Sequence, residues 1–378
     1  MSGHSVPYQL RTNKFVERQL FLDLLDCVRV WNGPSHYVYA SMGGRFLEDF
    51  KQVNDRYAIE QMISIEDDKT TCDRQKYNRL GFIECRNELS SQFVQDMDRL
   101  KASHEDKIFI VWLDFTEANK RGKQLAEYRE LVSKLSVGDV VKVTLNANFQ
   151  SFRKRSDILR QKDFDAYLKD ADSETHKDFE TYLQSILGRA VSGDDNVTER
   201  ILTLSDSEHE KICLKNLDEQ LDNFKNVESC PSEILTKKTF AEFLSQSIKI
   251  AALKGIGQGL KITPLSAFRY QDGEHQMLTS TAIISDDDLK KKITKDVVFE
   301  QWPFRSNKWN EVHEINVPDL SPKERHLIDG LLSDDLSFED IHEKIPFRFD
   351  KRDDRSLALL KEYVQHYRRY PTFGRVQS

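Results

Sequence analysis

The sequence predicts an α/β fold built on a doubly wound, mostly parallel sheet. Strand-like apolar runs alternate with helical patterns between residues 37 and 145. One of these runs, IFIVWL at 108–113, is apolar throughout, as expected of a central parallel strand that is buried on both faces. Two later strand-like stretches, 261–270 and 276–285, flank an Asp-Gly pair, which is a strong signal for an antiparallel hairpin.

The first strand–helix–strand unit carries the features of a nucleoside site. A short aromatic and β-branched run ends at the turn Ser-Met-Gly-Gly (41–44), a helical pattern follows, and a second apolar run (62–65) ends in three acids that begin with Glu66. Glycines let the backbone approach a ligand, a helix start offers unpaired N–H groups, and an acid at this position can accept hydrogen bonds from ribose hydroxyls. The alternative is a tight turn that needs glycine for packing alone.

Other polar residues follow the remaining predicted strands. In open parallel sheets, ligands bind at the carboxyl ends of the strands. We therefore expect convergence there of the segments 41–44, 66–68, 86–88, 114–116 and 146–148.

The N-terminal segment 13–31 predicts an amphipathic helix that packs beside the first strand. Arg11, Lys14 and Arg18 lie at or near its start, where the helix dipole does not favour positive charge. These residues could contact an anion or form a solvated surface, and we favour the solvated surface.

The second half of the chain departs from the alternation. Residues 150–235 are polar, acidic and helical in pattern, which indicates a helical insertion, and 286–317 is expected to be an irregular strap. Past Pro318 the pattern predicts three short helices, which could be a DNA reader or, as we favour, a small bundle. The expected organisation is a Rossmann-like domain at 1–317 and a C-terminal three-helix region at 318–378.

Composition narrows the class of protein. The 378 residues carry a net charge of −7, and 31% of them are charged. No apolar run reaches the roughly 20 residues that cross a bilayer, and the N-terminus has no secretory signal pattern. The five cysteines are scattered, which favours free thiols in the cytoplasm, and the isolated histidines give no support for a metal site.

With these residues in place, the chain resembles the class I S-adenosylmethionine-dependent methyltransferases over roughly 36–148 and 239–285. The resemblance implies S-adenosylmethionine as cofactor, a glycine-rich loop at 41–44, an acid at Glu66 for the ribose, Asn87 or Glu88 near the adenine, and Asp114 facing the methyl group as catalytic residue. The cofactor-binding residues that it implies are Ser41, Met42, Gly43, Gly44, Glu66, Asp67, Asn87, Asp114 and Phe115.

Three departures from that family's pattern concern the chemistry. The loop lacks the acid that lies near the methionine amine, and the Asp-Phe-Thr after the fourth strand lacks the Pro-Pro-Tyr of amino-methylating DNA enzymes. No cysteine lies where a C5-cytosine enzyme needs its nucleophile.

The chain is also similar to bacterial O-methyltransferases of unknown substrate, some of them associated with mobile elements and phage defence.

Three functions follow as hypotheses. The first is an S-adenosylmethionine-dependent methyltransferase acting on an oxygen or on a nucleic acid. The second is a catalytically degenerate relative that binds nucleic acid or a protein partner, through Arg153, Lys154 and Arg155 and the basic tail 351–375. The third, a nicotinamide-dependent enzyme, is the least favoured, because G-x-G-x-x-G is absent.

Overall fold

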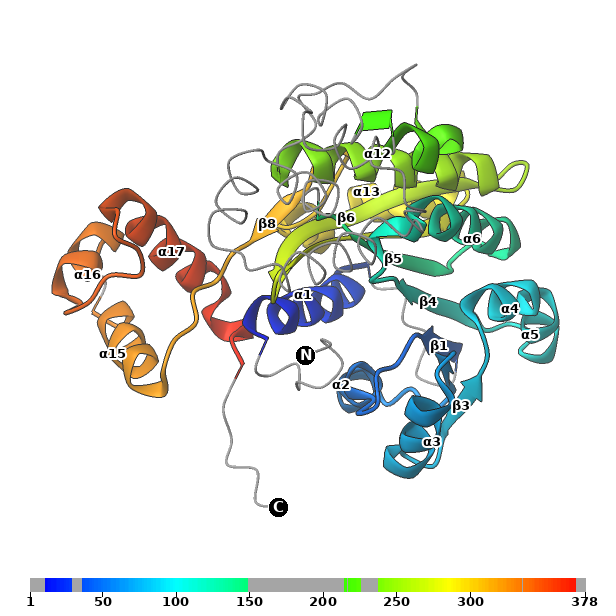
Figure 1. Ribbon diagram of the computed structural model, residues 1–378, viewed down its shortest axis with the longest axis horizontal. Coiled ribbons are helices and arrows are strands. Elements are labelled where there is room, and N and C mark those ends of the chain that lie inside the picture. Colours follow the sequence, from blue (N-terminus) through cyan, green and yellow to red (C-terminus); the bar gives the residue numbers. More distant parts are fainter. Residues whose placement is uncertain are drawn as a thin grey trace, which may run out of the picture.

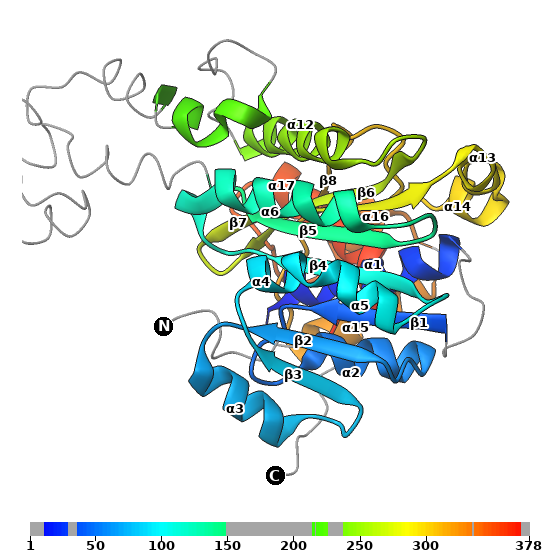
Figure 2. The same cartoon turned by 90° about the vertical axis from the view of Figure 1, so that its right-hand side faces the viewer.

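The computed structural model describes residues 11–28, 36–148, 214–215, 217–225, 237–334 and 336–371. Within them a single 8-stranded sheet has the order β3-β2-β1-β4-β5-β7-β6-β8 (Figure 2). The strands are β1 (Tyr37–Ser41), β2 (Met62–Glu66), β3 (Ile83–Asn87), β4 (Ile108–Asp114), β5 (Val140–Asn146), β6 (Lys261–Asp272), β7 (His275–Ser285) and β8 (His313–Ile315).

The directions of the strands match the predicted fold class. Strands β3, β2, β1, β4 and β5 pair in parallel, and β7 is inserted antiparallel between β5 and β6. β6 and β7 form the hairpin around Asp272-Gly273, and β8 pairs in parallel with β6 at the edge. The prediction of a doubly wound α/β fold with a mostly parallel sheet is confirmed.

Helices cover both faces of the sheet. One core contains side chains from α4, α5, α6 and α12, and the other contains side chains from α1, α2 and the C-terminal helices. Figure 2 shows α6 in front of the strands and the C-terminal helices behind them. The helices named here are α1 (Thr12–Val28), α2 (Glu48–Tyr57), α3 (Lys69–Asn78), α4 (Ser90–Gln95), α5 (Met97–Ser103), α6 (Arg121–Lys134) and α12 (Lys237–Gly255).

The expectation of an irregular strap at 286–317 was wrong. This segment contains α13 (Asp287–Lys295), α14 (Val297–Gln301) and strand β8. Each of the two helices begins at an aspartate that caps it: Asp286 accepts a hydrogen bond from the Leu289 amide at 2.7 Å, and Asp296 accepts one from the Val298 amide at 2.8 Å. An aspartate at the N-cap is a signal for the start of a helix. We gave this signal too little weight because the tryptophans and the proline of the segment suggested irregular structure.

Three C-terminal helices, α15 (Pro322–Leu332), α16 (Phe338–Lys344) and α17 (Asp353–His366), form a group beside the sheet (Figure 1). Tyr370, which follows α17, is tied to the segment before α15: its hydroxyl accepts from the Leu320 amide at 2.7 Å and donates to the Pro318 carbonyl at 3.2 Å. Arg369 also donates to Asp23 of α1 at 2.5 Å. These contacts hold the C-terminal end of the described chain against α1.

Two further sequence predictions can be compared with the structure only within the described residues. Of the predicted helical insertion at about 150–235, the structure describes 214–215 and 217–225 only, so the remainder of that prediction lies outside the described residues. In the part of the chain that is described, no helix combines the length and the apolar character needed to span a membrane.

Candidate functional site

The register of the parallel strands places the predicted site residues on one face of the sheet. Ser41 lies beside Ser64 on β2 and beside Trp112 on β4, and Glu66 lies beside Asn87 on β3. Glu66 and Asp114 are each two residues beyond those partners, and side chains two apart on a strand point to the same face. Ser41, Glu66, Asn87 and Asp114 therefore share the face that α1, α2 and α3 cover, at the carboxyl ends of their strands.

The loop after β1 is held in place by packing as well as by glycine. A Cβ on Gly43 would lie 2.6 Å from Ser64 Oγ and 2.7 Å from the Phe50 ring, closer than such atoms approach. The Gln75 side chain of α3 donates to the Gly43 carbonyl, and Ser64 donates to Gln75 at 3.0 Å. Packing against β2 and α2 therefore requires glycine at position 43, and it also fixes the path of the loop.

The start of α2 lies immediately after this loop. Its N-cap residue, Leu47, has φ 53°, and no side chain caps the helix. The left-handed conformation is uncommon for a residue with a Cβ and costs free energy. The amides of the first turn of α2 therefore lie at the edge of the loop without the side-chain acceptor that begins most helices.

Acidic residues surround the end of β2. The side chain of Asn87 donates through Nδ2 to the Glu66 carbonyl at 2.9 Å and to the Asp67 carbonyl at 3.1 Å, which fixes the turn that leaves the strand. Glu66 Oε1 accepts from the Asp68 amide at 3.1 Å, and Asp68 in turn caps α3. Burial raises the pKa of Glu66 to about 7; the bond from the Asp68 amide opposes this rise, and the neighbouring Asp67 carboxylate adds to it.

The end of β4 lies against α1. Asp114 Oδ2 accepts from Arg18 Nη2 at 3.1 Å, and it lies 3.8 Å from the Lys14 ammonium. Burial would raise the pKa of Asp114, but Lys14, Arg18 and Lys142 outweigh that effect and hold the pKa below its usual value. Asp114 is therefore an ionised carboxylate at neutral pH.

The expectation that the basic start of α1 is solvated surface was wrong for Lys14 and Arg18. Arg18 is 2% exposed and Lys14 is 7% exposed. Both face carboxylates: Arg18 contacts Asp114, and Lys14 also lies 3.6 Å from Asp272 of β6. An isolated charge is costly to bury because it loses its hydration. The ion pairs compensate Lys14 and Arg18 for this cost.

A lysine in the middle of β5 extends the same charged cluster. The ammonium of Lys142 lies 2.8 Å from Glu17 Oε1 and 3.4 Å from the centroid of the Trp112 ring. Burial lowers its pKa to about 8, although Glu17 opposes the change. A lone lysine within an otherwise apolar strand is a signal in the sequence that we did not use.

Ser41 Oγ and Asp114 Oδ1 are buried oxygens on this face that accept no hydrogen bond of good geometry from the described residues. Ser41 is fully buried. The Thr144 hydroxyl, beside Asp114 in the register, donates to Thr279 at 3.3 Å, and its proximity also helps to hold the pKa of Asp114 low. Unpaired buried oxygens are costly, so both atoms mark places where a ligand donor would be stabilising.

The remaining predicted residues lie apart from this face. Met42 packs against the core on the opposite side of the sheet, and Phe115 is buried in that core. The Phe115 amide donates to the Thr144 carbonyl at 3.0 Å, which ties the segment after β4 to β5. The side chain of Asp67 is exposed. Sequence reasoning missed three residues of the charged cluster, which are Glu17, Asp49 and Lys142, and assigned Arg18 to solvated surface.

The sequence matches the family model described as "Putative O-methyltransferase" over residues 6–378. The chain belongs to this family. Membership of a methyltransferase family confirms the resemblance seen in the sequence, and S-adenosylmethionine as cofactor agrees with it. In the described part of this O-methyltransferase family member, no group of three or more His, Cys, Asp or Glu side chains could hold a metal ion.

Similar solved structures include PKMT2 from Rickettsia typhi in complex with AdoHcy, with a TM-score of 0.30 and 10% identity. A second structure of PKMT2 from Rickettsia typhi has a TM-score of 0.31 and 10% identity. Each match covers 90% of this chain and 72% of the other. No curated protein matches the sequence.

Proposed function

We propose that this protein is an S-adenosylmethionine-dependent O-methyltransferase whose cofactor binds along the carboxyl ends of β1, β2, β3 and β4. The observation that carries the proposal is the row of side chains Ser41, Glu66, Asn87 and Asp114 on one face of the sheet. Family membership supports the reaction class. The acceptor is an oxygen nucleophile whose identity the proposal leaves open.

The nucleoside half of the cofactor fits the end of β2. Glu66 is partly exposed, and its carboxylate would accept hydrogen bonds from both ribose hydroxyls. Asn87 holds the turn at Glu66 and Asp67. We therefore assign it the role of shaping the adenine end of the site. The backbone of 42–44 would border the ribose on its other side.

The amino-acid half fits the unpaired oxygens. A methionine ammonium donates three hydrogen bonds, and Ser41 Oγ and Asp114 Oδ1 are buried acceptors that receive no hydrogen bond of good geometry from the described residues. They would take the place of the acid that the loop after β1 lacks. The two halves of the site thus use different side chains, which allows them to be tested separately.

The chemistry required of the protein is small. When bound, the cofactor supplies an electrophilic methyl group, and catalysis consists mainly of aligning the acceptor oxygen with it. Asp114 stays ionised because of its cationic neighbours, so it would orient the acceptor hydroxyl as a hydrogen-bond acceptor. As a proton acceptor it would be weak for the same reason.

Isothermal titration calorimetry with S-adenosylmethionine and S-adenosylhomocysteine tests the proposal. We expect both to bind wild-type protein and Glu66→Ala to weaken binding about tenfold or more, since a charge-assisted hydrogen bond is lost. Glu105→Ala is the matched control, because Glu105 is an exposed acid just before the amino end of β4, at the opposite end of the parallel strands. No binding by folded wild-type protein, or equal affinities of the two variants, would sink the proposal.

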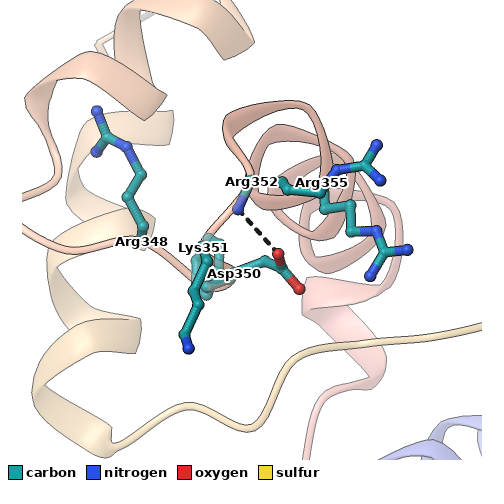
Figure 3. Close-up of a pocket in the computed structure, with 6 residues that line it drawn as sticks. Arg348, Asp350, Lys351, Arg352 and Arg355 are labelled. Carbon is teal, nitrogen blue, oxygen red and sulfur yellow. Dashed lines mark hydrogen bonds between the residues drawn. The ribbon is translucent and has the colours of Figure 1, made fainter.

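A second candidate function is contact with nucleic acid through the C-terminal helices. A shallow hollow there is lined by four cations and by Asp350, whose carboxylate accepts from the Arg352 amide at 2.9 Å (Figure 3). Arg352 and Arg355 point to one side, whereas Arg348 and Lys351 point away from them and from each other, so the hollow suits phosphates spaced along a backbone better than a single anion. The basic stretch Arg153, Lys154 and Arg155 lies outside the described residues.

A salt-dependent gel shift tests this second candidate. We expect binding of single- or double-stranded nucleic acid at low salt, and we expect it to weaken in Lys351→Ala/Arg355→Ala. Lys290→Ala/Lys291→Ala is a control with the same change of charge on exposed α13. No shift at low salt would exclude this function.

A further inference from the structure

A buried arginine on α1 contacts both segments that flank the proposed cofactor site. Arg18 Nη2 donates to Asp114 Oδ2 at 3.1 Å, and Arg18 Nε donates to Asp49 Oδ1 at 3.3 Å. Asp114 ends β4, and Asp49 is the second residue of α2, the helix that follows the glycine loop. A single side chain therefore joins the start of α2 to the end of β4.

Further contacts fix the plane of the Arg18 guanidinium. Nη1 donates to the Tyr270 hydroxyl and to Glu17 Oε2, both at 3.0 Å. The guanidinium carbon lies 4.5 Å from the centroid of the Trp112 ring, as in a stacked cation–π pair. A planar fork held by this many contacts has little freedom, so the positions of its carboxylate partners are fixed with it.

The role of Arg18 differs from that of its cationic neighbours. Lys14 and Lys142 also supply positive charge near Asp114. Both also act on Asp49 through their charge, whereas Arg18 contacts the Asp49 and the Asp114 carboxylates directly. Charge compensation is therefore shared among three residues, while the bridge between α2 and β4 depends on the shape of the arginine side chain.

We propose, on the basis of the function proposed above, that Arg18 is a positioning residue for the cofactor site. It holds the Asp114 carboxylate and the first turn of α2 at the separation that S-adenosylmethionine binding requires. The N-terminal helix α1, which lies outside the strand–loop–helix unit of the nucleoside site, is thereby part of the binding apparatus. Arg18 acts through Asp114 and Asp49 and need not touch the ligand.

Two substitutions separate position from charge. Arg18→Lys keeps the positive charge and loses the fork, whereas Arg18→Met loses both. We expect Arg18→Lys to recover most of the thermal stability that Arg18→Met loses. We also expect Arg18→Lys to bind S-adenosylhomocysteine about tenfold more weakly than wild type, in the range of coupling between contacting residues. Calorimetry measures the affinity, and thermal unfolding measures the stability.

Lys101→Met is the matched control, because it breaks the ion pair with buried Asp139 at the amino end of β5. It should lower stability and leave affinity unchanged. The second measurement is the double variant Arg18→Lys/Asp114→Asn, whose loss of affinity should be smaller than the two single losses combined. That non-additivity is expected if Arg18 acts through Asp114.

Each contrary result has a distinct meaning. If wild-type protein binds and Arg18→Lys binds equally well, does not fold, or adds its full effect to that of Asp114→Asn, Arg18 is not a positioning residue. The proposed function survives that outcome. If folded wild-type protein binds neither S-adenosylmethionine nor S-adenosylhomocysteine, the proposed function and this inference both fall.

Discussion

Glu66 and Asn87 lie side by side at the carboxyl ends of β2 and β3, and the Asn87 side chain donates through Nδ2 to the Glu66 backbone carbonyl at 2.9 Å. The carboxylate of Glu66 thus lies at the carboxyl end of β2, on a turn that is held by a side chain from the neighbouring strand β3. The charge state of this carboxylate governs two of the predictions below.

Ligand affinity should depend on pH through Glu66. Because its pKa is about 7, the carboxyl group is mostly protonated at pH 6 and mostly ionised at pH 8. Only the ionised form offers both oxygens as acceptors to the ribose. We expect affinity for S-adenosylhomocysteine to rise about tenfold from pH 6 to pH 8 in wild-type protein. Calorimetry should find the affinity of Glu66→Gln nearly constant over the same interval.

The same pKa affects stability in the ligand-free protein. The raised pKa means that folded protein retains a proton between about pH 4.5 and 7 that the unfolded chain has released. Glu66 therefore lowers the free energy of unfolding as pH rises through that interval. We expect Glu66→Gln to remove part of this decline, as measured by urea unfolding at pH 5 and pH 7. A steeper decline in the variant would contradict the assigned shift.

Gly43 and Gly81 offer a matched pair of substitutions. A Cβ at Gly43 would meet Ser64, Phe50 and Leu47 within 2.8 Å, whereas a Cβ at Gly81 would meet nothing within 4 Å. We expect Gly43→Ala to lower the free energy of unfolding by about 1–3 kcal/mol through overpacking. Gly81→Ala should change it by less than about 0.5 kcal/mol. Equal effects in denaturant unfolding would show that the loop relaxes freely.

Ser41→Ala should separate ligand binding from stability. Its hydroxyl is fully buried and has no hydrogen-bond partner among the described residues, so its removal leaves no group newly unpaired. We expect thermal stability to be unchanged or slightly raised. Affinity for S-adenosylhomocysteine should fall, while affinity for 5′-methylthioadenosine, which lacks the amino-acid half, should not. A parallel loss for both ligands would place Ser41 at the nucleoside instead.

The ion pair between Lys142 and Glu17 should be costly to break from one side. Lys142→Met leaves Glu17 Oε1 buried without its cation, and we expect a loss of about 3 kcal/mol in the free energy of unfolding. The double variant Lys142→Met/Glu17→Leu removes both charges and should be more stable than Lys142→Met alone. Urea unfolding of the variants tests this, and simple addition of their effects would contradict it.

Much of the site was predictable because it depends on local order along the chain. An apolar run predicts a strand, the residue after it lies at the carboxyl end, and parallel strands bring those ends together. This reasoning placed Glu66, Asn87 and Asp114 correctly at one edge of the sheet, as the register shows. Their roles in binding and catalysis stay predictions.

The charged cluster on α1 was not predictable in the same way. Lys14 and Arg18 have the spacing of an exposed helix face, and only the packing of α1 against β4 and β6 brings them to Asp114 and Asp272. Helical periodicity predicts which residues share a face of a helix. It does not predict which carboxylates, distant in sequence, that face will contact. The segment 286–317 was missed for a different reason, because its helices are short and depend on their capping aspartates.

Hydrogen exchange measured by mass spectrometry, with and without S-adenosylhomocysteine, tests the central claim most directly. The account predicts slower exchange in peptides that cover the loop 42–47 and the turn 66–68, with a smaller effect around Asp114, and no change in the C-terminal helices. Protection absent from the loop and the turn, or confined to residues 348–355, would contradict it.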